Sequence, residues 1–291
     1  MKTNDIQMRD PYVVLHQGKY YMTGTTDKNA WIGPFVGFDV YESDDMENWS
    51  GPFPAFRAGS GFFADRNFWA PEIHEYKGEF YLFASFKADD IRRGTAVLKS
   101  QSSSPKGPYT LHSDGNITPS DWECLDGTLH VDEIGAPWMV FCHEWVQEGG
   151  GTICALPLSP DLKSATGEAV TLFAASDTLW PKQITHSTGI SGHVTDGPSI
   201  FKPKSGGLWM LWSSMTDSGY GIGLSISESG NIMGPWKHQE QALFSADGGH
   251  GMVFADKTGQ LYLTIHTPNK TPNERPIFLK LKETAEGFSI I

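Results

Sequence analysis

The chain has few cysteines, few clustered basic residues and no long apolar run. Its 3 Cys among 291 residues are Cys124, Cys142 and Cys154, an odd number without the paired spacing of a metal site. We expect buried free thiols in a reducing compartment, in preference to a disulfide or a metal site.

Basic residues are also scarce: 22 Lys and Arg stand against 34 Asp and Glu, for a formal net charge of −12. The only basic doublet is Arg92-Arg93. Nucleic acids and anionic membrane surfaces are bound through clustered Lys and Arg, so we expect neither as a partner. No run approaches the roughly 20 apolar residues that a membrane helix needs.

The N-terminal residues 1–8 lack the charged segment and following apolar segment of a secretory signal. We therefore expect a cytoplasmic location. The sequence predicts no organic cofactor and leaves the oligomeric state open.

What the sequence does contain is one pattern repeated five times: a short apolar strand, a turn at glycine and a second apolar strand. The first copy covers residues 8–22 and turns at Gly18. Its strands are rich in aromatic and β-branched residues, as half-buried or buried strands are. The inner strands of the five copies open at Asp10, Ala70, Asp126, Asp196 and His250.

Each copy continues into a third and a fourth short strand with turn residues between them. Openers that recur every 54 to 70 residues, with four strands per repeat, are typical of a β-propeller. We predict an all-β fold, a five-bladed β-propeller with four antiparallel strands per blade, forming one domain over residues 1–291.

The openers gain chemical meaning from this fold, because the first strand of every blade lines the central channel. Residues distant in sequence then converge, and the expected group is Asp10, Asp126, Asp196 and His250, with Glu72 nearby. A single Asp-Gly or Asp-Pro is most often a turn. Three acids in one register instead indicate a site where mutual repulsion and burial raise at least one carboxyl pKa.

These segments resemble glycoside hydrolase family 43. The resemblance rests on five segments that occur in that family's order and blade spacing: Arg9-Asp10-Pro11, Trp69-Ala70-Pro71-Glu72, the Asp126 opener, Asp196-Gly197-Pro198 and His250-Gly251. Each segment is weak by itself, but together they are fairly specific and cover nearly the whole chain.

The resemblance implies hydrolysis of glycosidic bonds with inversion. The family's general base corresponds to Asp10, and the Asp that orients the acid and tunes its pKa corresponds to Asp126. The family's general acid is a Glu, whereas the matching position here is Asp196. Its side chain is one methylene shorter, so the carboxyl oxygen lies roughly 1.5 Å further from the leaving group.

A second candidate acid is Glu144, because aligning the second strands of the blades places it at a strand end near the catalytic face. It is also a candidate to accept a sugar hydroxyl or to be a plain rim carboxylate. Other expected substrate-binding residues come from the aromatic loops and from polar tips of the strands: Phe62, Trp69, Glu72, His143, Trp145 and Arg275.

The resemblance also implies a cation near His250, held through water. Calcium takes oxygen ligands, so one imidazole is not a typical ligand set for it. We therefore expect a largely hydrated calcium or other cation, with a hydrogen-bonded core histidine as the alternative.

The function expected from the sequence is that of an exo-acting glycosidase that removes terminal α-L-arabinofuranosyl residues from plant-derived oligosaccharides. A β-D-xylosidase or a galactofuranosidase on the same scaffold stays open. From another class, a carbohydrate-binding propeller without catalysis stays open as well, since it needs the same aromatic and polar lining but no paired acid and base.

Overall fold

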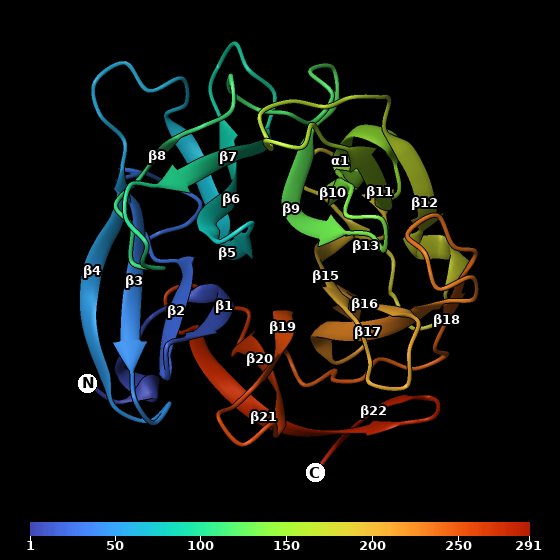
Figure 1. The fold of residues 1–291 in the computed structure, drawn as a ribbon. Coiled ribbons are helices and arrows are strands. Elements are labelled where there is room, and N and C mark those ends of the chain that lie inside the picture. The colour runs from blue at the N-terminus through green and yellow to red at the C-terminus, as the bar shows by residue number, and fades with distance from the viewer.

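The computed structural model describes residues 1–291 and is almost entirely β. Five antiparallel four-stranded sheets follow one another along the chain and stand around a central axis (Figure 1). This confirms the predicted five-bladed β-propeller. None of its helices is long and apolar enough to cross a membrane.

The strands of blade 1 are β1 (Arg9–His16), β2 (Lys19–Thr25), β3 (Gly37–Ser43) and β4 (Trp49–Arg57), and those of blade 2 are β5 (Arg66–Tyr76), β6 (Glu79–Lys87), β7 (Gly94–Ser100) and β8 (Tyr109–Leu111). Blade 3 consists of β9 (Cys124–Val131), β10 (Pro137–His143), β11 (Thr152–Pro157) and β12 (Val170–Ala174). Blade 4 has β15 (Asp196–Phe201), β16 (Leu208–Thr216), β17 (Gly219–Ser227) and β18 (Trp236–His238), and blade 5 has β19 (Gly249–Ala255), β20 (Leu261–Thr267), β21 (Arg275–Thr284) and β22 (Gly287–Ile290).

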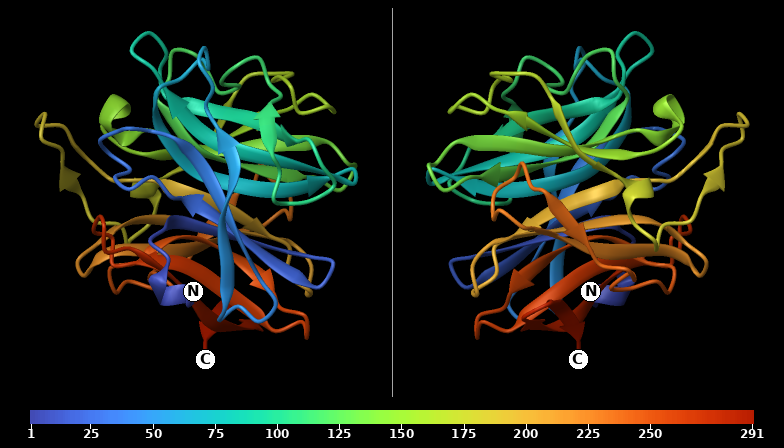
Figure 2. Two further views of the ribbon diagram at one scale, coloured as in Figure 1. Left: turned by 90° about the vertical axis from the view of Figure 1, so that its left-hand side faces the viewer. Right: turned by 90° about the vertical axis from the view of Figure 1, so that its right-hand side faces the viewer.

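Few elements lie outside the blades. The helices are single turns: η1 (Thr3–Asp5), α1 (Trp145–Glu148) and η2 (Ala175–Asp177). A small hairpin of β13 (Ile184–Thr185) and β14 (Ser191–Gly192) connects blades 3 and 4. Figure 2 shows this hairpin projecting beyond the blades on the same side as α1.

The middle strands are apolar on both faces because each blade packs between two others. In β6, every residue between the two terminal ones is buried. Such strands appear in the sequence as continuous apolar runs and not as alternating ones. The core is correspondingly divided into five clusters, each shared by two neighbouring blades.

The ring closes between blade 5 and blade 1 through one of these clusters, in which Met8 and Val13 pack with Met252 and Phe254. A buried ion pair strengthens the closure: Arg9 Nη1 lies 2.8 Å from Glu274 Oε1, and Glu274 is fully buried. Removing one partner of such a pair leaves a buried charge without compensation, which is strongly destabilising.

The three cysteines are buried and free, as the sequence predicted. Burial raises the pKa of the Cys124 and Cys154 thiols above their usual range. Protonated thiols in a packed core are inert, which favours a purely structural role.

We predict that Gly251→Ala destabilises the protein. A Cβ at this position would lie 1.6 Å from the Thr264 carbonyl oxygen on the neighbouring strand, so the backbone must shift. Overpacking of this kind costs about 1–3 kcal/mol or more, and the melting temperature should fall by several degrees.

The matched control is Gly59→Ala, since a Cβ there meets no atom within 4 Å. Its melting temperature should stay close to that of the native chain. Equal melting temperatures for the two variants would contradict the packing argument.

Candidate active site

The inner strand of every blade carries a β-bulge at the same point, and the residue in the bulge has a left-handed backbone. In blade 1, for example, the pairing register shifts between Arg9 and Tyr12. The five bulge residues and their φ angles are Asp10 at 54°, Ala70 at 45°, Asp126 at 58°, Gly197 at 50° and His250 at 47°. Four are not glycine, and such strain persists only where surrounding contacts hold it.

Those contacts are hydrogen bonds between blades. The bulge N–H of one blade donates to a side chain on the second strand of the preceding blade: Ala70 to Thr25, Asp126 to Ser85, His250 to Ser213, and Asp10 to His266 across the ring closure. In blade 3 the equivalent second-strand residue, paired with Leu125, is Cys142. The Gly197 N–H donates instead to Oδ2 of Asp126, at 3.0 Å.

The expectation of three acids in one register is therefore wrong for Asp196. The residue in register with Asp10 and Asp126 is Gly197, and Asp196 precedes it. A Cβ at Gly197 would lie 2.5 Å from the ring of His250, so no larger residue fits beside that ring. The third carboxylate enters the site from the neighbouring position of the strand.

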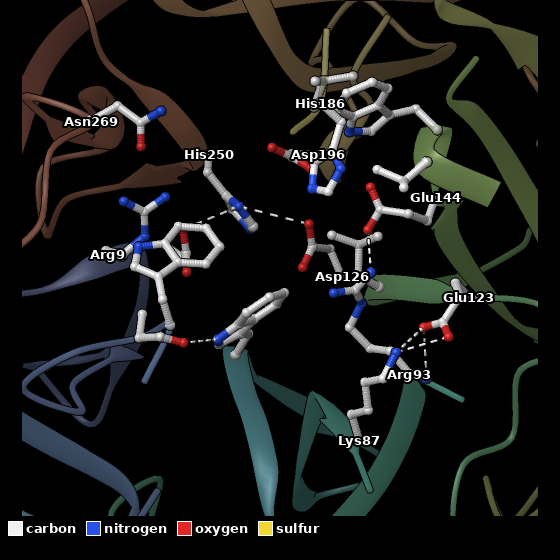
Figure 3. A pocket seen from close by; sticks show the side chains of 18 of the residues that line it. Arg9, Lys87, Arg93, Glu123, Asp126, Glu144, His186, Asp196, His250 and Asn269 are labelled. Atoms are coloured by element: carbon white, nitrogen blue, oxygen red, sulfur yellow. Dashed lines mark hydrogen bonds and ion pairs between the residues drawn. The ribbon is translucent and has the colours of Figure 1, made fainter. Parts of the chain in front are cut away.

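The channel opens into a cavity of about 710 Å³ at one face of the propeller (Figure 3). Seven of the residues predicted from the sequence line this cavity: Asp10, Trp69, Asp126, Glu144, Trp145, Asp196 and His250. They come from all five blades or from the loops that follow their strands, so the propeller brings them together although they span 240 positions of the chain.

The imidazole of His250 lies between two carboxylates. Its Nδ1 is 3.2 Å from Oδ1 of Asp10 and 3.8 Å from Oδ2 of Asp126. Burial lowers the pKa of His250, but the charges of Asp10 and Asp126 outweigh burial and leave it raised. For Asp10 burial raises the pKa, whereas His250 and Arg9 bring it below its ordinary value. Asp10 is therefore held as the ionised carboxylate.

Asp196 has the opposite environment. Its pKa is raised from 3.8 to about 7, mainly by burial and next by repulsion from Asp126. The Tyr220 hydroxyl donates to its Oδ2 at 2.9 Å, which orients the carboxyl group. The pKa of Asp126 is raised to about 6 by burial, with His250 opposing the shift. One carboxyl group that keeps its proton near neutral pH thus faces the same cavity as one that does not.

The walls of the cavity are charged and aromatic. Arg93 pairs with Glu144, and its guanidinium lies over the ring of Trp69, at 4.9 Å from the ring centroid. Arg9 lies in the same way over Trp31, at 5.1 Å. The two tryptophan rings meet edge to face, and Trp31 is 55% exposed. Such faces and donors suit a ligand with both apolar patches and hydroxyl groups.

Four residues predicted to bind substrate lie outside the cavity, and this corrects the prediction. Phe62 packs on Phe56 and Phe86 in the core between blades 1 and 2. Arg275 donates to the backbone carbonyls of Asn4, Pro272 and Glu274.

The other two of these residues are engaged with protein neighbours. Glu72 is buried with its Oε2 2.9 Å from Nε2 of His74. His143 stacks on Trp122, with ring centroids 4.3 Å apart, and its Nε2 lies 3.0 Å from Gln147.

Sequence reasoning did not assign site roles to several residues that line the cavity: Arg9, Trp31, Arg93, His186, Tyr220 and Asn269. Two of them could have been found from the sequence: Arg9 precedes the opening residue Asp10, and Trp31 lies in a loop rich in aromatic residues. Tyr220 could not, because it follows a turn glycine at the start of a third strand. Only the packing of β17 against β19 of the next blade brings its hydroxyl to Asp196.

The expected cation near His250 stays a prediction. No group of three or more His, Cys, Asp or Glu side chains has an arrangement that could hold a metal ion directly. The imidazole of His250 faces Asp10 through Nδ1. This donor set does not fit a directly coordinated ion, and only a mostly hydrated ion agrees with it.

This arrangement can donate a proton to a bound molecule on one side and remove a proton from a water molecule on the other. An ionised carboxylate can deprotonate water, and a protonated carboxyl group can protonate a leaving oxygen. Two carboxyl groups with separated pKa values in one cavity provide both at the same pH.

Comparison with known proteins agrees with the fold and with this chemistry. The model of the family described as glycosyl hydrolases family 43 matches residues 4–287. Among solved structures, the endo-arabinase from Bacteroides thetaiotaomicron VPI-5482 is similar, with a TM-score of 0.90 and 39% sequence identity over 98% of each chain.

Curated relatives are more distant. The alpha-L-arabinofuranosidase 43 of Humicola insolens is 26% identical over 97% of this chain and 61% of its own length. The extracellular exo-alpha-(1->5)-L-arabinofuranosidase of Cellvibrio japonicus (strain Ueda107) is 27% identical over 48% of this chain and 42% of its own length. The chain thus spans less than two thirds of either relative.

The opposite pKa shifts predict opposite effects of amide substitution on stability. The raised pKa of Asp196 means that the fold favours its neutral form, so its contribution to stability is lost as pH rises through about 7. As the pH rises from about 4 to about 8, the melting temperature of Asp196→Asn should therefore increase relative to that of the native chain.

Asp10→Asn should behave in the opposite way. The lowered pKa of Asp10 means that its ionised form stabilises the fold at neutral pH and that this contribution is lost in acid. The contribution of Asp10 changes only below its ordinary pKa of 3.8, so melting curves of both variants and of the native chain from about pH 2 to about pH 8 test the assignment. Parallel pH dependences for the two variants would contradict it.

Proposed function

Because the chain belongs to the glycosyl hydrolases family 43, we propose that it hydrolyses α-L-arabinofuranosyl linkages with inversion and removes terminal residues from oligosaccharides. The observation that carries the proposal is the pair of Asp10, held ionised, and Asp196, with a pKa raised to about 7, in one cavity. A binding module without catalysis has no need of two carboxyl groups with separated pKa values.

In the proposed mechanism Asp196 is the general acid. Its proton passes to the glycosidic oxygen as the bond to the anomeric carbon breaks, so the leaving sugar departs as a neutral alcohol. Tyr220 donates to one carboxyl oxygen of Asp196, which leaves the other free for this transfer. Asp126 raises the pKa of Asp196 by repulsion and accepts the backbone N–H of Gly197, so it is a positioning residue.

Asp10 is the general base and takes a proton from the water that attacks the opposite side of the anomeric carbon. The Thr25 hydroxyl donates to Oδ2 of Asp10 at 2.6 Å, and His250 lies beside Oδ1. Both contacts hold the carboxylate in one orientation. Asp10 and Asp196 belong to blades 1 and 4, and this placement on different blades favours the wider separation of carboxyl groups that inversion requires.

Glu144 is the weaker candidate for the acid. Its carboxylate pairs with Arg93, whereas a general acid must hold a proton that it can donate. Its place in the cavity supports a role in binding instead.

Arabinose as the substrate sugar is supported by the two curated relatives, both named as arabinofuranosidases, and terminal action by the aromatic and charged walls that surround the cavity. Internal cleavage is the second candidate, since the solved structure with 39% identity is named an endo-arabinase.

We predict that Asp196→Ala separates activated from natural substrates. An aryl α-L-arabinofuranoside has a good leaving group that needs no proton, so its turnover should be largely retained. Turnover of a natural oligosaccharide should fall about 10²- to 10⁴-fold, the usual contribution of general acid catalysis. Release of chromophore and release of sugar measure the two rates.

Two matched variants give the controls. Asp10→Asn should lose both activities, because every substrate needs the attacking water. Glu144→Gln should not reproduce the separation. An Asp196→Ala variant with both rates unchanged, or a Glu144→Gln variant that separates them, would overturn the assignment of the acid.

The products from linear α-1,5-arabinan distinguish terminal from internal cleavage. We expect free arabinose from the earliest times with little loss of viscosity, and little release from aryl β-D-xylosides or β-D-galactofuranosides. Early mixtures of oligosaccharides with a rapid fall in viscosity would show the endo mode instead. Product anomers followed by NMR should show inversion.

A further inference from the structure

The β13–β14 hairpin contributes one side chain to the cavity, that of His186. In Figure 3 this imidazole lies over the part of the cavity that holds Asp196 and Glu144. The ring of Trp145, the residue that follows Glu144, meets that of His186 edge to face at 5.9 Å. His186 therefore belongs to the wall beside the proposed general acid.

The hairpin is held at both of its stems, so this position is not that of a loose loop. At one stem the Lys182 N–H donates to the carbonyl oxygen of Met215 at 2.7 Å. At the other the Gly151 N–H donates to the carbonyl oxygen of His193, also at 2.7 Å.

Contacts with α1 and within the hairpin complete the support. A Cβ at Gly192 would lie 2.5 Å from the carbonyl oxygen of Gly149, so the hairpin lies directly against the end of α1. Across the hairpin the hydroxyls of Thr185 and Ser191 are 2.8 Å apart.

The hairpin tip also sets the tautomer of His186. The backbone N–H of Thr188 donates to Nδ1 at 3.2 Å, and the Thr188 hydroxyl lies 2.8 Å from the same atom. An Nδ1 that accepts hydrogen bonds leaves the proton of the neutral ring on Nε2. The ring thus offers one N–H donor that the hairpin itself does not use.

We propose that His186 donates a hydrogen bond from Nε2 to a hydroxyl group of the sugar on the leaving-group side of the scissile bond, and so favours saccharide over other leaving groups. This rests on the proposed function, because the general acid marks the side on which the leaving group lies. Asp196 protonates the oxygen of the leaving sugar, so a donor in the wall beside Asp196 faces that sugar. Trp145 supplies an apolar face next to it.

The test compares two substrates that share the arabinofuranosyl group and differ in the leaving group. When the terminal residue is removed from linear arabinotriose, the leaving group is a disaccharide that carries sugar hydroxyls; from an aryl arabinofuranoside it is an aryl alcohol without them. For His186→Ala the ratio of kcat/KM on arabinotriose to kcat/KM on the aryl glycoside should fall about three- to tenfold, as for one neutral hydrogen bond.

A second variant reaches the same site without touching a residue of the cavity. Gly192→Ala pushes the hairpin away from α1, so the ratio should fall in the same direction. Gly150→Ala is its matched control, since a Cβ there meets no atom within 4 Å. Ser187→Ala, exposed at the hairpin tip, is the control for His186→Ala. Both controls should keep the native ratio.

An unchanged ratio in His186→Ala, or an equal fall in Ser187→Ala, would overturn the inference while the proposed function stands. A native chain that releases sugar from neither substrate would instead refute the proposed function and this inference with it. Circular dichroism and melting curves on each variant show that the fold is kept, so a lower ratio reports binding.

Discussion

The active site depends on the left-handed backbone at one point of each inner strand. This conformation turns the side chains of Asp10, Asp126 and His250 toward the channel axis, and L-residues adopt it only under constraint. The constraint comes from the neighbouring blade, whose hydroxyl or imidazole accepts the bulge N–H. The hydrogen bonds that join neighbouring blades therefore also fix the geometry of the site.

The break in that pattern is informative. Where the other blades have a hydroxyl or imidazole, blade 3 has Cys142, a poor acceptor, and Asp126 takes the Gly197 N–H instead. This bond fixes the carboxylate of Asp126 against the backbone that carries Asp196. The residue that tunes the acid is therefore attached to it by the main chain, and the repulsion that raises the pKa of Asp196 acts at a fixed separation.

The buried charges have a thermodynamic consequence. Three carboxyl groups share one channel; the imidazole of His250 lies within 4 Å of two of them, and the third keeps its proton to higher pH. A fold that holds a neutral carboxyl group loses stability as that group ionises. The interblade clusters and the Arg9 to Glu274 closure supply the rigidity that keeps these groups together despite the repulsion.

Repetition of short apolar strands with glycine turns was sufficient to predict five blades, because the number of strands per repeat and the burial of each strand are local properties. The acids at the openers followed from the same repeats, and so did Trp69 and Trp145. The sequence alone could not place Tyr220, Arg93 or His186, since their roles depend on which loops and third strands meet across blades. It also misplaced Phe62 and Arg275, because an aromatic or a cation near a strand end has the same pattern whether it packs in the core, braces the ring or faces the cavity. Only the packing of blade on blade decided which of these side chains face the cavity and how far apart they lie.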